Sequence, residues 1–201
     1  RLVGSEMCIR DRITIIDFIG EVDGAVVVTT PPSSHLEIVS AAAEKGIHVL
    51  LEKPMAPTVA ACRLMLVAAQ QYGTVLSVAE NYRRDPIARL MRALIATSAI
   101  GEVRSVLDFL MSGGRAAQAG GWQYKRNQGG PLLLMGVHNA DLQLYMAGSI
   151  ERIYGQVRLR ETAREFHGAA VKRFHEHYAS EYPERETADA PDVLMATLEY
   201  E

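Results

Sequence analysis

HVLLEKP, residues 48–54, is the stretch that decides the fold class of this chain. It begins with an apolar run typical of a buried strand, and the run ends abruptly in Glu52, Lys53 and Pro54. Charged residues at the end of a buried strand point to chemistry, because ligands of open α/β sheets bind beyond the carboxyl ends of the strands. The segment therefore predicts an open α/β sheet with a functional lysine at its edge.

Further apolar runs lie on both sides of this segment. Strands are expected at residues 24–30, 47–51 and 74–80. The first intervening helix can be capped by Ser33 or Ser34 and ends near Gly46, and the second can be capped by Thr58 and runs to about Tyr72. Strand, helix, strand, helix, strand is the alternation of a doubly wound parallel sheet.

The pattern changes after Asn81, where a second domain is expected to begin. Helices are expected at residues 86–95 and 131–148, extended segments or strands at 102–112, 153–160 and 193–201, and a polar loop at 113–128. The charged stretch 162–186 is interpreted as a solvated helix and loop, so its three histidines, His167, His175 and His177, are not expected to bind a metal. Isolated helices among extended segments predict a partial α+β domain with a mainly antiparallel sheet.

The composition is that of an ordinary globular protein. Among 201 residues, 48% are hydrophobic and 22% are charged, and the net charge is −3. This charge gives no general attraction to nucleic acid or to an anionic membrane, and no apolar run approaches the roughly 20 residues of a membrane helix. Cys8 and Cys62 make neither a disulfide framework nor a zinc site, so a reducing, cytoplasmic location and no bound metal are expected.

Four motifs in a fixed order carry a resemblance to a known family. They read TPPSSH at residues 30–35, EKP at 52–54, NYRRDP at 81–86, and the glycine-rich GGPLLLMGVHNAD at 129–141. Over about residues 13–201 the chain resembles the glucose–fructose oxidoreductase / inositol dehydrogenase (Gfo/Idh/MocA) family. The resemblance implies a Rossmann-type dinucleotide-binding domain over residues 13–81 and a substrate and oligomerisation domain over 82–201, both incomplete. Residues 1–12 are interpreted as a non-native leader.

The resemblance also implies an activity and a set of site residues. The expected activity is hydride transfer between NAD or NADP and a sugar, polyol or related secondary alcohol or ketone, in a protein that forms homo-oligomers. Catalytic roles would fall to Lys53, His138 and Asp141. Cofactor contacts would come from Thr30, Pro31, Pro32, His35, Glu52, Lys53, Pro54 and Asn81. Substrate contacts would come from Arg83, Trp122, His138 and Asp141.

Physical chemistry supports these roles and leaves alternatives open. Leu134, His138 and Asp141 share one helix face, and a histidine there can act as base or acid or can be a satisfied core residue. Lys53 can take part in proton transfer or be a surface lysine at a strand end. The family implies a cis peptide before Pro54, while Glu52 either orients the local backbone or contacts the cofactor.

Two candidate substrate regions have equally plausible structural roles. Arg83 can bind a substrate oxygen or seal a domain junction. The aromatic rings of Trp122 and Tyr124 can stack on a sugar face or pack against the second sheet.

Two departures from the family pattern leave other functions open. Residues 13–23 contain no G-x-G-x-x-G turn, so the adenosine half of the cofactor is expected to lack its site in this chain. Leu134 also stands where the family has an acidic residue, four positions before His138. The alternatives are a non-catalytic dinucleotide-binding sensor or regulator, and an inert fragment of an enzyme.

Overall fold

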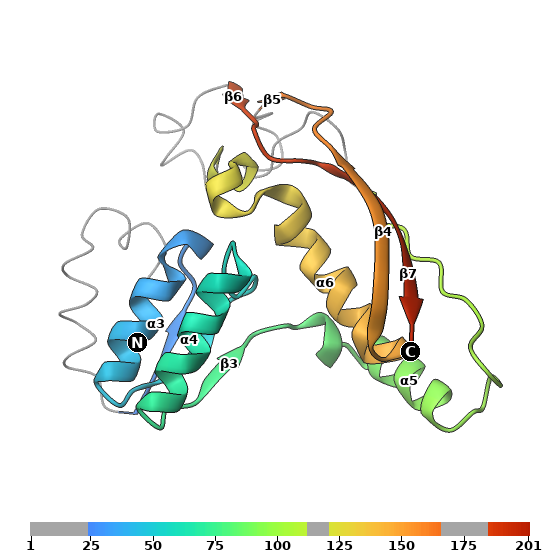
Figure 1. Ribbon diagram of the computed structural model, residues 1–201, viewed down its shortest axis with the longest axis horizontal. Coiled ribbons are helices and arrows are strands. Elements are labelled where there is room, and N and C mark those ends of the chain that lie inside the picture. The colour runs from blue at the N-terminus through green and yellow to red at the C-terminus, as the bar shows by residue number, and fades with distance from the viewer. Residues whose placement is uncertain (1–23, 112–120, 166–184) are drawn as a thin grey trace. The chain divides into compact units, whose positions relative to one another are not determined.

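The computed structural model describes residues 24–111, 121–165 and 185–201 (Figure 1). The chain divides into two compact units, with the boundary between Asn81 and Tyr82. The first unit contains a parallel sheet with helices, and the second contains antiparallel strands. The predicted fold class, a partial Rossmann-type sheet followed by a partial α+β domain, is confirmed.

Three short strands form the sheet of the first unit. They are β1 Ala25–Val28, β2 His48–Leu51 and β3 Leu76–Val78. Their order is β1-β2-β3 and both pairs are parallel, with Val27 opposite Leu50 and Leu50 opposite Ser77. Helices α3 His35–Glu44 and α4 Val59–Gln71 connect consecutive strands. The elements occur in the predicted order, although the strands are shorter than expected.

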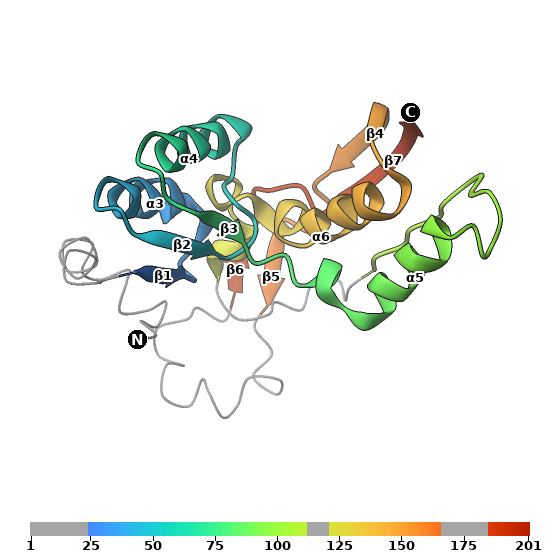
Figure 2. The ribbon, with the colours of Figure 1, turned by 90° about the horizontal axis from the view of Figure 1, so that it is seen from below.

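The core of the first unit lies between the sheet and its two helices, which cover the same face of the sheet (Figure 2). Successive strand residues point to opposite faces, so Val49 and Leu51 are buried while Leu50 between them is 40% exposed. Burying each large aliphatic side chain contributes about 1.5–3 kcal/mol. The core cluster comprises Val28, Ile38, Val39, Ala42, Ile47, Val49, Leu51, Ala56 and Met65.

The two helix starts of this unit differ from each other. Thr58 caps α4 as predicted, because its Oγ1 accepts a hydrogen bond of 3.2 Å from the amide of Ala61. Ser34 precedes α3 but makes no such bond, so the prediction of a serine cap was wrong for this residue. The 3₁₀ turn η1 Pro32–Ser34 leads directly into α3, and its backbone carbonyls take the place of a capping side chain.

The second unit begins with short helical elements and two longer helices. These are η2 Tyr82–Arg84, α5 Pro86–Ala96, η3 Gly121–Tyr124, η4 Arg126–Gln128 and α6 Gly130–Ala147. Asp85 caps α5 through a 2.8 Å hydrogen bond from the amide of Ile87 to its carboxylate. Residues 101–111 form neither helix nor strand. Pro86 and Pro131 open their helices as predicted.

The strands of the second unit form two antiparallel pairs. β4 Ile150–Arg158 pairs with β7 Val193–Tyr200, and β5 Ala163–Glu165 pairs with β6 Arg185–Thr187. The ends of the charged stretch 162–186 are therefore strands, where a helix and loop were predicted. Its histidines, His167, His175 and His177, lie outside the described residues.

The start of α6 is built on two glycines. Gly129 and Gly130 have positive φ angles of 95° and 70°, which side-chain-bearing residues rarely adopt. A Cβ on Gly130 would collide with the Cβ of Ala190, and one on Gly129 would lie 2.6 Å from Cδ2 of Leu133. The first turn of α6 therefore lies directly against the segment that precedes β7. None of the helices described for residues 24–111, 121–165 and 185–201 has the length and apolar character to cross a membrane.

Candidate functional site

The carboxyl ends of the three parallel strands lie at one edge of the first sheet. Thr29 and Thr30 follow β1, Glu52 and Lys53 follow the central strand β2, and Asn81 comes three residues after β3. Thr30 and Lys53 are half-buried, and Asn81 is exposed. The sheet topology thus brings to one edge the hydroxyl, ammonium and amide groups that were selected from the sequence.

The turn after β2 has two defined features. The peptide bond between Lys53 and Pro54 is cis, as the family resemblance implied, and Pro54 is fully buried. The carboxylate of Glu52 accepts a 2.9 Å hydrogen bond from the backbone N–H of Lys53. Glu52 therefore orients the local backbone, which was one of its two predicted roles.

The loop after β1 is held by side chains of the following turn. The Ser34 hydroxyl lies 2.7 Å from Oγ1 of Thr30 and 2.9 Å from the carbonyl oxygen of Pro31. His35 is fully buried, with Nε2 2.8 Å from the carbonyl oxygen of Thr30 and Nδ1 3.1 Å from that of Met55. Its side chain contacts two backbone carbonyls, and the cofactor contact predicted for it stays a prediction.

In the second unit, His138 lies on α6 and is only 3% exposed. The ring of Tyr82 stacks on it, with centroids 3.9 Å apart and planes 10° apart. Asp141, one turn further along α6, is held by Arg83 through bonds of 2.8 and 2.6 Å to its two oxygens. The Arg83 guanidinium also lies 5.1 Å from the ring centre of Tyr145. Arg83 thus has a structural role within this unit, joining η2 to α6.

The two aromatic candidates both lie in η3, before α6, and they differ in burial. Trp122 is half-buried in η3. Tyr124 is 7% exposed, and the guanidinium of Arg164 lies over its ring, 4.8 Å from the centre. Tyr124 therefore packs inside the second unit, which was the structural alternative, while Trp122 stays a candidate for substrate contact.

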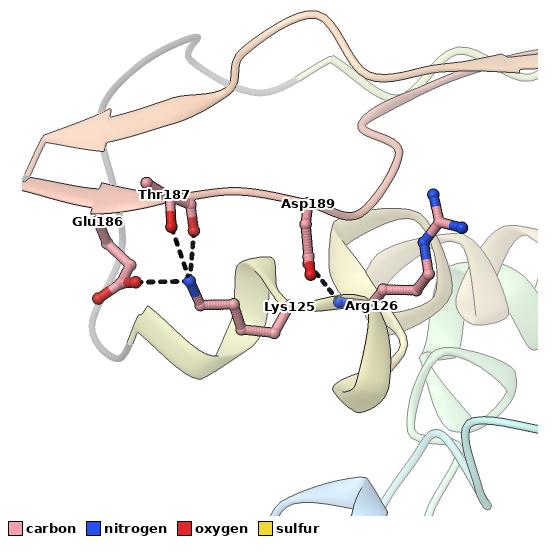
Figure 3. A network of polar contacts seen from close by, with 5 residues as sticks. All are labelled: Lys125, Arg126, Glu186, Thr187 and Asp189. Atoms are coloured by element: carbon pink, nitrogen blue, oxygen red, sulfur yellow. Dashed lines mark hydrogen bonds and ion pairs between the residues drawn. The ribbon is translucent and has the colours of Figure 1, made fainter.

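A polar network ties this segment to β6 and to the residues after it (Figure 3). Nζ of Lys125 lies 2.6 Å from Oε1 of Glu186 and donates to the carbonyl and hydroxyl oxygens of Thr187 at 2.7 and 3.0 Å. Asp189 accepts a 2.7 Å bond from the amide of Arg126. Sequence reasoning missed these residues, because partners about sixty positions apart leave no local pattern.

A buried ion pair stabilises the same region. Arg164 and Asp192 lie 2.7 Å apart, and both side chains are 8% exposed. Asp192 also accepts bonds of 2.7 and 2.9 Å from the amides of Arg160 and Glu161. Its carboxylate is therefore satisfied by three donors, the condition under which a buried charge is tolerated.

Two groups have shifted pKa values. Burial, and then the negative charge of Asp108, raise the pKa of Tyr200 above 10.0. Its hydroxyl donates a 2.7 Å hydrogen bond to Gln143 on α6, whose amide donates to Asp108 at 3.1 Å. Burial also raises the pKa of the Cys62 thiol, which makes this cysteine a weak nucleophile. Over the described residues, no group of three or more His, Cys, Asp or Glu could hold a metal ion.

Comparison with known families identifies both units. A model of the oxidoreductase family with an NAD-binding Rossmann fold matches residues 19–80, and a model of the GFO/IDH/MocA C-terminal domain matches residues 88–201. The chain belongs to the Gfo/Idh/MocA family. Residues 19–80 of this Gfo/Idh/MocA chain are therefore part of an NAD-binding Rossmann domain.

Curated relatives of this Gfo/Idh/MocA chain include several sugar-converting enzymes. Levoglucosan dehydrogenase of Pseudarthrobacter phenanthrenivorans is 32% identical over 158 residues, covering 76% of this chain and 40% of the enzyme. The 1,5-anhydro-D-fructose reductase of Ensifer adhaerens is 35% identical over 131 residues, 64% of this chain and 39% of that enzyme. The chain thus spans about 40% of the length of these relatives.

A solved structure of levoglucosan dehydrogenase in complex with NADH and L-sorbose has the same fold. It matches with a TM-score of 0.70 and 26% identity, covering 94% of this chain and 48% of that one.

Proposed function

We propose that this Gfo/Idh/MocA protein is an NAD(P)-dependent oxidoreductase acting on a sugar, a polyol or a related secondary alcohol or ketone. The observation that carries the proposal is Lys53 at the carboxyl end of the central strand of an NAD-binding Rossmann domain. Ligands of such sheets bind beyond this edge. The names of the relatives, which are sugar dehydrogenases and reductases, support the substrate class.

The groups at this edge fit the nicotinamide half of the cofactor. A carboxamide and ribose hydroxyls need short polar partners, and Thr30 and Asn81 supply a hydroxyl and an exposed amide. Pro31 and Pro32 restrict the backbone of the turn that joins Thr30 to α3. Buried Pro54 restricts the backbone beside Lys53 in the same way. These residues would hold the nicotinamide and its ribose, and the bound ring would accept or supply the hydride.

The proton that accompanies hydride transfer needs its own acceptor or donor. We assign this role to Lys53, whose ammonium can hydrogen-bond the substrate oxygen, and to His138 as an acid or base. Asp141 would act through its pair with Arg83, which fixes α6 beside η2. Trp122 would contact the substrate.

The test is turnover by the protein expressed from its complete reading frame. With NAD and NADP and a panel of anhydrosugars, aldoses and polyols, we expect a change in the absorbance of reduced nicotinamide with at least one substrate. The same panel with Lys53→Met should give little or no turnover. Tight dinucleotide binding without turnover on any substrate would contradict the proposal.

One observation favours a second candidate, a sensor or regulator of the same family that binds dinucleotide without hydride transfer. Leu134, one turn before His138 on α6, has no side-chain hydrogen-bonding group where the family pattern has an acid. Leu134→Asp separates the two candidates. A gain in turnover from a measurable starting rate supports the enzyme, while the appearance of turnover in an inactive protein supports the regulator.

Self-association through the β4–β7 sheet is also part of the proposal. Ile153 and Val157 of β4 and Leu194 of β7 lie on one face of this pair and are all more than half exposed. Clustered apolar side chains of this kind mark interaction surfaces. Light scattering should give a mass above that of one chain, and Ile153→Glu should lower it while Ile87→Glu on α5 should not. A cytoplasmic location, expected from the cysteine content, stays a prediction.

A further inference from the structure

The side chain of His35 links the loops that follow β1 and β2. Its Nε2 lies 2.8 Å from the carbonyl oxygen of Thr30, and its Nδ1 lies 3.1 Å from the carbonyl oxygen of Met55. The ring has 0% exposure, so water does not replace either partner. One imidazole therefore connects two loops that lie about twenty residues apart in the chain.

A histidine at this place is not explained by packing alone. The first turn of α3 is buried against an apolar core, where a leucine or phenylalanine would fill space without polar atoms to satisfy. A carbonyl oxygen only accepts hydrogen bonds, and a neutral imidazole carries one N–H, so the tautomer decides which of the two carbonyls accepts a hydrogen bond from the ring. What the imidazole adds over an apolar side chain is a donated hydrogen bond to one carbonyl from a ring that also lies against the other.

Both carbonyls belong to the segments that would surround the nicotinamide. The Thr30 carbonyl directly precedes Pro31, and its orientation sets the course of the loop. Met55 follows the cis peptide of Lys53 and Pro54. The turn that carries Lys53 is therefore fixed on one side by the carboxylate of Glu52 and on the other through the Met55 carbonyl.

We propose that His35 is a positioning residue for hydride transfer. Its ring fixes the loop at residues 29–34 and the turn at residues 52–56 relative to each other, so that cofactor and Lys53 meet in one arrangement. This inference rests on the proposed function for its kinetic consequence, but its structural part does not. It is separate from the direct cofactor contact that the sequence alone suggested for His35.

The structural part is tested by hydrogen–deuterium exchange on this chain. In His35→Phe, which fills similar space without N–H groups, peptides covering residues 29–35 and 52–58 should exchange faster than in the wild type. Peptides from the second half of α4 should exchange at an unchanged rate. Unchanged exchange in both loops, or an equal increase throughout the first unit, would overturn the proposal.

His35→Gln is the second variant, in case His35→Phe does not fold. Its side-chain amide keeps an N–H donor, so it should restore part of the protection that His35→Phe loses. His48→Phe is the matched control, because His48 is exposed and its Nδ1 accepts a bond from the amide of Val75 away from both loops. It should leave exchange in both loops unchanged.

The kinetic part is tested in the protein expressed from its complete reading frame. His35→Phe should lower kcat by about tenfold to hundredfold, because misplaced reacting groups slow the chemical step. The primary deuterium isotope effect from a deuterated substrate should rise. A smaller active fraction with unchanged KM and unchanged isotope effect would show a merely structural role and refute the inference. Absence of wild-type turnover would instead count against the proposed function, and the exchange experiment would still decide the role of His35.

Discussion

The ring of Tyr82 lies almost parallel to the imidazole of His138, 3.9 Å away between centroids and tilted by 10°. The tyrosine comes from η2 and the histidine from α6, so the stack fixes the orientation of a buried ring between two elements. Tyr82 thus contacts one face of the His138 ring, and Arg83, the next residue of η2, holds both oxygens of Asp141 on the same helix.

Replacing Tyr82 tests this stack. Stacked aromatic pairs contribute about 0.5–1.5 kcal/mol beyond burial, so Tyr82→Leu should lower the free energy of unfolding by about 1 kcal/mol. Tyr82→Phe keeps the ring and should lose less stability than Tyr82→Leu. Urea unfolding followed by circular dichroism gives both values. An equal loss in the two variants would mean that the hydroxyl group, and not the ring, matters.

Lys53 should matter for chemistry and little for stability. Positioned acid–base groups contribute about 10²–10⁴-fold to rate, so Lys53→Met should lower kcat/KM by a factor in that range. Its unfolding free energy should change by no more than about 0.5 kcal/mol, as for most substitutions outside the core. Lys45→Met, an exposed lysine at the end of α3, is the control and should keep full activity.

The buried pair of Arg164 and Asp192 predicts an unequal cost of removing its two members. Asp192→Ala removes one acceptor from the buried guanidinium and one from each of two backbone amides, and should destabilise by about 3–5 kcal/mol. Arg164→Met leaves a carboxylate that still accepts two bonds, and should cost less. Arg152→Met, which breaks an exposed pair, should cost at most about 1 kcal/mol. A lower melting temperature for Arg164→Met than for Asp192→Ala would contradict this account.

Stability at alkaline pH should depend on Tyr200. Burial and the Asp108 charge raise its folded pKa above 10.0, so the folded state keeps a proton that the unfolded chain loses first. The resulting stability is complete below about pH 10 and is lost as pH rises through the folded pKa. The stability difference between wild type and Tyr200→Phe should therefore shrink above about pH 10. A constant difference in urea unfolding at neutral and alkaline pH would refute this.

The elements of residues 24–81 could largely be predicted from the sequence, because their signals are local. Apolar runs ending at turn residues marked the three strands, and Thr58 marked the start of α4. The catalytic candidates came from the resemblance of four motifs to the family, and for Lys53 also from its place after a predicted buried strand. The Ser34 cap failed because a 3₁₀ turn, invisible in a residue pattern, precedes α3.

Long-range polar contacts could not be predicted from the sequence. No sequence pattern around Lys125 predicts its ion pair with Glu186, and none around Arg164 predicts its ion pair with Asp192. The short pair of β5 and β6 was missed because three-residue strands in a charged stretch have no apolar alternation to reveal them. One contact of His35 is with a carbonyl twenty residues away, so its motif alone could not predict where the side chain lies.

The contact between Gly130 and Ala190 has a practical consequence for engineering. Because even one methyl group on Gly130 would collide with Ala190, a library that enlarges Gly130 is expected to displace the start of the helix that carries His138. Mutagenesis aimed at substrate preference in the proposed reaction is better directed at Trp122, which is half-buried and outside that contact. Gly130 and Ala190 should stay unchanged in such experiments, so that the variants can be compared with one another.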